Sequence, residues 1–155
     1  MVRLADADDA FWHEVREDIK AHVDDILRDW ERITSEEPWM SLPEHHRLDA
    51  LPLVARALCD AALARGGGTA QAYRRFVSAA AEHGETRRKQ GFGRELLFTE
   101  HYLLRQAIWR YVRSHHLARA PEVLVRVDAA VTSGTRASLI GFHRGEFEAR
   151  GRWPA

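Results

Sequence analysis

The feature that most constrains this chain is an apolar stripe along residues 8–33. Its members follow one another at spacings of three or four residues, which keeps them on one face of a helix. They are Phe11, Val15, Ile19, Val23, Ile26, Trp30 and Ile33. Asp8 or Asp9 is expected to cap the start of this helix, where negative charge also suits the helix dipole. A long helix with one apolar face needs other helices to cover that face.

Four further segments carry the helical pattern, and no segment alternates in the way a strand does. They span approximately residues 43–64, 69–90, 94–116 and 121–151. Pro52 lies inside the first of them and predicts a kink or a restart, and Thr69 is expected to cap the next. Gly134, Gly141 and Gly145 weaken the second half of the last segment. We therefore predict an all-α fold, a bundle of about five helices.

Length and composition constrain the number of domains and the cellular compartment. The length of 155 residues favours a single domain spanning 1–155. With Cys59 as its one cysteine, the chain cannot form an internal disulfide, which favours a reducing compartment. No apolar run approaches the roughly 18 residues of a membrane span, and the N-terminus lacks the pattern of a signal peptide. We expect a cytoplasmic protein with no membrane partner.

Charge and motif searches argue against several functions. The 23 basic and 23 acidic residues are interspersed, whereas binding to nucleic acid needs an uncompensated basic patch. Nine histidines invite a metal hypothesis, but no Glu-x-x-His, His-Glu-x-x-His or Cys-x-x-Cys occurs. Cys59 has small apolar neighbours, which is typical of an inert core residue. We expect no catalytic residues, no metal ligands and no cofactor.

The stretch "HGETRRKQGF", residues 83–92, is the most unusual part of the chain. Gly84 sits inside a predicted helix, where glycine costs roughly 1 kcal/mol relative to alanine, so a compensating role in packing is expected. If the third and fourth helices form an antiparallel hairpin that turns at Phe92, Gly84 faces Glu100 and lets the two backbones come close. His83 and Arg87 lie on one helix face, four residues apart.

This register predicts that Glu100 is buried and pairs with Arg87 or His83 from the third helix. The alternative is that Glu100 is a solvated residue that contacts only its own helix. The two possibilities differ in free energy of unfolding, because a buried charge that loses its partner is far more costly than a surface charge.

These residues resemble a known family. The pattern His83, Gly84, Arg87, Gly91 and Phe92, followed by Glu100 and Arg105 in "LLFTEHYLLRQAIWR", is similar to the signature of the RsbRD N-terminal domain. The earlier "DALP", residues 49–52, and "ILRDWERI", residues 26–33, also resemble parts of that family. The resemblance covers residues from about 10 to 148.

The resemblance implies a non-catalytic sensory or regulatory input domain of the kind that precedes bacterial sensor histidine kinases and stressosome-type regulators. An output domain or a signalling partner protein is implied with it, so the chain is either a stand-alone homologue or an excised domain. A second hypothesis from a different class is a stand-alone helical protein that binds a small molecule or a metal, possibly as an enzyme.

Tryptophan content adds a prediction about assembly. Five tryptophans are more than a small core needs, and aromatic residues are favoured at the centres of protein interfaces. They are Trp12, Trp30, Trp39, Trp109 and Trp153. We therefore expect a homodimer that packs through helices, including the first and the last.

Overall fold

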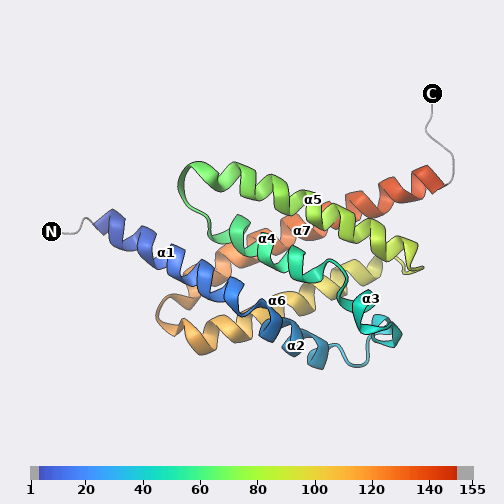
Figure 1. Ribbon diagram of the computed structural model, residues 1–155, viewed down its shortest axis with the longest axis horizontal. Helices are drawn as coiled ribbons and strands as arrows, with labels where there is room; N and C mark the ends of the chain where they lie inside the picture. The colour runs from blue at the N-terminus through green and yellow to red at the C-terminus, as the bar shows by residue number, and fades with distance from the viewer. Residues whose placement is uncertain (1–3, 150–155) are drawn as a thin grey trace.

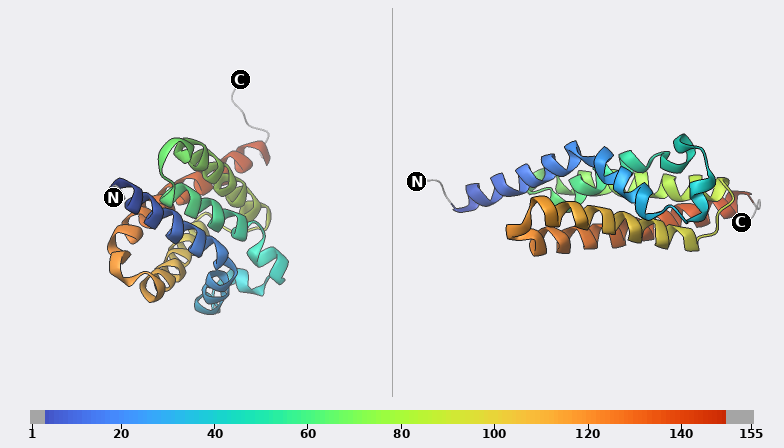
Figure 2. Two further views of the ribbon diagram at one scale, coloured as in Figure 1. Left: turned by 60° about the vertical axis from the view of Figure 1, so that its left-hand side comes forward. Right: turned by 90° about the horizontal axis from the view of Figure 1, so that it is seen from below.

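The computed structural model describes residues 4–149, and within them every regular element is a helix (Figure 1). This confirms the all-α prediction for the described part of the chain. The helices are α1 (Leu4–Ala21), α2 (Val23–Ile33), α3 (Glu44–Leu48), α4 (Leu51–Leu63), α5 (Thr69–Lys89), α6 (Glu95–His115) and α7 (Ala120–Ala149). The long helices give an elongated bundle when it is seen from below (Figure 2). Three single turns of 3-10 helix, η1 (Pro38–Ser41), η2 (Gly66–Gly68) and η3 (Leu117–Arg119), lie in the connections.

Two of the five predicted helices are each divided into two. The first divides at His22, whose ring contacts the backbone oxygen of Asp18 at 2.8 Å and competes with the helix for that group. The helix also begins before residue 8, so the predicted caps are wrong, and Asp8 instead pairs with Arg65 and Arg119. Asp9 lies inside α1 as well.

The second predicted helix divides at Asp49, where φ is +41°, and Pro52 stands in the first turn of α4. The predicted restart is therefore confirmed, because proline fits a first turn and not a helix interior. Thr69 is the first residue of α5 and not its cap, and its hydroxyl donates to the oxygen of Gly66 at 2.9 Å. The predicted end near Gly151 lies outside the described residues.

Three of the tryptophans belong to the core of a single chain. Trp12, Trp30 and Trp39 are buried, and the rings of Trp30 and Trp39 stack with their centroids 5.8 Å apart. Trp109 is partly buried and donates to Asp128, while Trp153 lies outside the described residues. These three buried rings are covered within one copy and so give no support to a homodimer, which stays a prediction.

The closest helix pair is α5 with α7, which run in the same direction while α6 runs back (Figure 1). A Cβ added to Gly84 would lie 1.9 Å from the backbone oxygen of Ser138, and one added to Gly141 would lie 1.9 Å from that of Ala81. The role predicted for Gly84 in an α5–α6 hairpin is therefore wrong. Gly84 does allow a close approach, but to the last helix, whose own glycines form the other half of the contact.

Gly91 and Phe92 form the turn that joins α5 to α6. Gly91 has φ +88°, and its N–H donates to the oxygen of Arg88 while the N–H of Phe92 donates to that of Arg87. This is the Schellman arrangement, which needs a left-handed residue after the helix and suits glycine. Phe92 packs on the core. These two motif residues therefore set the end of α5.

Replacing Gly84 by alanine tests the α5–α7 contact. The added Cβ cannot fit against the backbone of Ser138, so Gly84→Ala should lower the free energy of unfolding by about 1–3 kcal/mol. Gly67→Ala is the matched control, because a Cβ there meets nothing within 4 Å. Urea denaturation that finds Gly84→Ala as stable as the natural chain would contradict the close approach.

Candidate functional site

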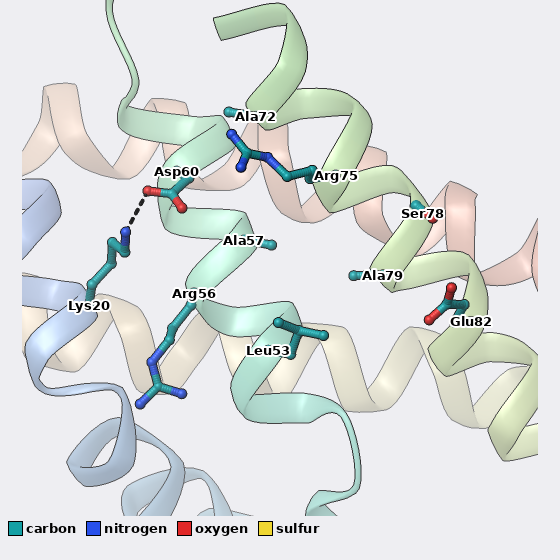
Figure 3. A pocket seen from close by; sticks show the side chains of 10 residues that line it. All are labelled: Lys20, Leu53, Arg56, Ala57, Asp60, Ala72, Arg75, Ser78, Ala79 and Glu82. Atoms are coloured by element: carbon teal, nitrogen blue, oxygen red, sulfur yellow. Dashed lines mark ion pairs between the residues drawn. The ribbon is translucent and has the colours of Figure 1, made fainter. Parts of the chain in front are cut away.

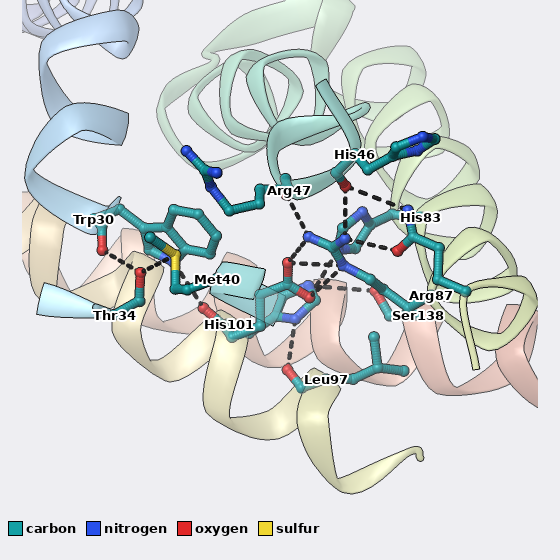
Figure 4. Close-up of polar contacts among 12 residues, drawn as sticks. Trp30, Thr34, Met40, His46, Arg47, His83, Arg87, Leu97, His101 and Ser138 are labelled. Atoms are coloured by element: carbon teal, nitrogen blue, oxygen red, sulfur yellow. Dashed lines mark hydrogen bonds and ion pairs between the residues drawn. The ribbon is translucent and has the colours of Figure 1, made fainter. Parts of the chain in front are cut away.

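A cluster of buried polar side chains lies between α5, α6 and α7, near the turn that joins α5 to α6 (Figure 4). Its members are His83, Arg87, Glu100, His101 and Ser138, and each is at most 2% exposed. We call this set the buried cluster. Charged side chains are almost never enclosed to this degree unless they are paired, so their partners decide what the cluster can do.

Glu100 is the acceptor at the centre of the buried cluster. Its Oε1 lies 2.6 Å from Nη2 of Arg87 and 3.1 Å from Nε, so the guanidinium donates through two nitrogens. Its Oε2 lies 3.0 Å from Nε2 of His83. The predicted burial of Glu100 and its pairing with the preceding helix are confirmed, and both predicted partners are present.

Arg87 extends the buried cluster to α3. Its Nη1 donates to the oxygen of His46 at 2.9 Å, and its Nη2 donates to that of Arg47 at 2.5 Å. These carbonyls lie in the last turns of α3, where a helix leaves acceptors without internal partners. Gln90 accepts from Nη1 at 2.7 Å. One guanidinium therefore joins α3, α5 and α6, which Figure 4 shows as dashed lines converging on Arg87.

His101 and Ser138 connect the buried cluster to α7. His101 Nδ1 lies 2.8 Å from the oxygen of Leu97, and Nε2 lies 3.2 Å from Oγ of Ser138. Burial lowers the pKa of His101 to about 4, so the ring is neutral at neutral pH. A carbonyl only accepts, so Nδ1 carries the hydrogen and Nε2 accepts. The single hydroxyl hydrogen of Ser138 is then shared between Nε2 and the oxygen of Ala80, 2.9 Å away.

Opposing effects act on the pKa of Glu100. Burial raises it, but attraction and hydrogen bonds from His83 and Arg87 outweigh burial and bring the pKa down to about 2. The carboxylate is therefore ionised at neutral pH. A carboxyl whose pKa is lower in the folded state stabilises the fold above its unfolded pKa, and this contribution is lost as pH falls from about 4.5 to about 2.

The enclosure of the buried cluster decides its chemistry. No member is accessible to a substrate from solvent, and His83 Nδ1 has no hydrogen-bond partner among residues 4–149. Within that range no three histidine, cysteine or acidic side chains are grouped so as to hold a metal ion. Cys59 is buried, and burial raises the pKa of its thiol to about 12, so it is not a nucleophile. The buried cluster is therefore closed to solvent, and its contacts are with the surrounding helices.

Arg105 is the predicted site residue that lies apart from the others. Its Nε donates to Asp128 of α7 at 2.8 Å, and its guanidinium lies 4.2 Å from the centroid of Trp109. It is partly exposed and holds α6 to α7 outside the buried cluster. Sequence reasoning missed Ser138, whose signal is its place on the same face of α7 as Gly134, Gly141 and Gly145.

A surface groove between α4 and α5 is the other candidate (Figure 3). It has a volume of about 500 Å³ and a floor of small side chains, among them Ala57 and Ala79. Lys20 and Asp60 already pair across one end at 2.9 Å, and Arg75 and Glu82 place opposite charges along its wall. Charges of both signs are therefore spread along the groove and do not converge on one point.

Comparison with protein-family models, with curated proteins and with solved structures found no match for this chain. The resemblance to the RsbRD N-terminal domain therefore rests on the motif residues alone. Among the described helices, none has the length and apolar character needed to cross a bilayer.

Replacing Glu100 by alanine measures what the buried cluster contributes to stability. The change leaves Arg87 buried and without its anion, so the free energy of unfolding should fall by about 3–5 kcal/mol. The control is Glu14→Ala, an exposed glutamate on α1, which should change it by about 0.5 kcal/mol or less. Chemical denaturation curves in which the two variants lose the same small amount would show that Glu100 behaves as a surface residue.

Proposed function

We propose that the chain is a non-catalytic sensory or regulatory input domain in which the buried cluster couples α3 to the packing of α5, α6 and α7. The observation that carries this proposal is the guanidinium of Arg87, which contacts the carbonyls of His46 and Arg47 on one side and Glu100 on the other. A displacement of α3 would remove two acceptors from a buried cation. The cation would then have to find other partners, which requires movement of α5 or α6.

Energetics support a conformational role. A buried ion pair is often no more stabilising than apolar side chains of similar volume, so its presence in a core calls for another explanation. A polar cluster whose hydrogen bonds can be exchanged provides two arrangements of similar free energy. The shared hydroxyl hydrogen of Ser138 and the unpartnered Nδ1 of His83 are places where such an exchange can begin.

The resemblance to the RsbRD N-terminal domain supports the same proposal. Of its motif residues, His83, Arg87 and Glu100 belong to the buried cluster, and Gly91 and Phe92 form the adjoining turn. In this proposal α5 and α6 act as one antiparallel hairpin joined by this turn, and α7 packs against both helices. The domain would act ahead of an output domain or on a partner protein, in the cytoplasm, and would self-associate as a homodimer.

A fused output domain tests the proposed function. Residues 1–155 are placed ahead of a histidine-kinase output domain, and autophosphorylation is measured for the natural sequence and for Arg87→Lys. Lysine keeps the charge but cannot donate to Glu100 and α3 together, so the two-state equilibrium should shift by about 1 kcal/mol and the basal rate by about fivefold.

The control is Arg28→Lys, at an exposed position of α2 outside the buried cluster, where lysine can keep the ion pair with Asp25. It should leave the rate unchanged. If Arg87→Lys also leaves the rate unchanged while the fusion remains folded by circular dichroism, the buried cluster does not transmit a signal.

A further inference from the structure

Exposed apolar side chains gather along both sides of α7. Among the described residues, seven large hydrophobic side chains are exposed, and four of them line the two grooves that flank this helix. They are Tyr73, Phe98, Tyr102 and Ile140. Exposed apolar patches of this kind mark interaction sites, and tyrosine and phenylalanine are favoured at interface centres.

The groove between α5 and α7 is the larger of the two, with a volume of about 670 Å³. Tyr73 and Val77 of α5 face Ala137 and Ile140 of α7 across it, and Ile140 is 58% exposed. The exposed side chain of Ile140 therefore forms an apolar ridge at the edge of the groove. A surface that carries both a ridge and a groove can pack against a copy of itself about a two-fold axis.

We propose that two copies of this chain associate through the α5–α7 groove, with their α7 helices antiparallel and the Ile140 side chain of each in the groove of the other. The charges that line the groove favour a second copy of this chain as the binding partner. Arg74, Glu82 and Glu85 line the α5 side of the groove, and Arg144 lines the α7 side, with Arg136 exposed one turn before Ile140 on α7. A partner of one uniform charge would therefore meet like charges within the groove, whereas a second copy presents both signs.

The register of the two helices shows which charges meet. Gly134 packs against Phe76, Gly141 against Ala81 and Gly145 against Arg88, so α5 and α7 are parallel and in step. If Ile140 of one copy lies opposite Ala137 of the other, antiparallel α7 helices bring Arg136 of one copy level with Glu85 of the other. The two-fold axis repeats this contact, so each dimer contains it twice.

The groove between α6 and α7 does not favour a second copy. Its volume is about 430 Å³, and its charged lining consists of Arg105 and Arg136, with no acidic side chain. Two copies joined there would place one basic lining against the other, and like charges across an interface oppose association. This groove therefore provides the control surface for the experiment.

The inference rests on the proposed function in one respect, since it assigns the surface for the self-association included there. The two can nevertheless fail separately. A dimer that forms through this groove while the Arg87→Lys fusion keeps its natural rate would leave the surface assigned and reject the sensory role. If Arg87→Lys changes the rate of the fusion while Ile140→Glu leaves the dimer dissociation constant unchanged, the surface alone is rejected.

Sedimentation equilibrium of the 155-residue chain over a range of concentrations tests the surface. The natural chain should form a dimer, and Ile140→Glu should raise the dimer dissociation constant at least about tenfold, because it buries charge at the centre of the interface. The matched control is Phe98→Glu, a similarly exposed residue of the other groove at 54%. It should leave the dissociation constant within about twofold of the natural value.

A charge exchange tests the antiparallel register. Arg136→Glu and Glu85→Arg should each weaken the dimer about tenfold, and the double variant should regain most of the lost affinity, because the pair is restored with its signs reversed. The inference is overturned by a monomer at every concentration up to the high micromolar range, or by a dimer that Phe98→Glu weakens and Ile140→Glu does not. A double variant that is weaker than both single variants also overturns it.

Discussion

The ionic contact between Arg87 and Glu100 is the constraint on which the rest of the structure depends. Both side chains are at most 1% exposed, and the carboxylate oxygen lies 2.6 Å from the guanidinium. Neither charge could remain in the core alone, because an unpaired buried charge costs several kcal/mol. The two helices that carry these residues must therefore keep one register, and the α3 carbonyls must stay where the remaining guanidinium hydrogens point.

The α5–α7 contact and the buried cluster are linked because both include Ser138. Gly84 follows His83 directly, and its missing side chain lets the backbone of Ser138 approach α5. The hydroxyl of the same serine then reaches the oxygen of Ala80 and the ring of His101. Close packing of small residues thus positions the hydroxyl that connects α7 to the cluster. A change in the α5–α7 packing would therefore also alter the hydrogen bonds of Ser138.

Sequence periodicity predicted what depends on a single helix or on residues a few positions apart. Helical class and the restart at Pro52 are of this kind, because spacing shows which residues share a face. The burial of Glu100 beside Arg87 followed instead from the hairpin register, which brings together residues 13 positions apart on two helices. Periodicity does not show which other helix covers that face. The hairpin register therefore predicted that Gly84 faces α6, whereas Gly84 packs on Ser138 of α7, more than 50 residues away in sequence. The division at His22 depends on a side-chain contact that no apolar pattern records.

A double-mutant cycle between Arg87 and Glu100 tests the central claim most directly. Free energies of unfolding are measured for the natural chain, Arg87→Met, Glu100→Leu and the variant that carries both. The account predicts a coupling energy of about 1.5–3 kcal/mol, with the double variant much more stable than the sum of the single losses implies, because neither charge is then left alone in the core. A coupling energy below about 0.5 kcal/mol would contradict the account, since it would show that the two charges do not depend on each other.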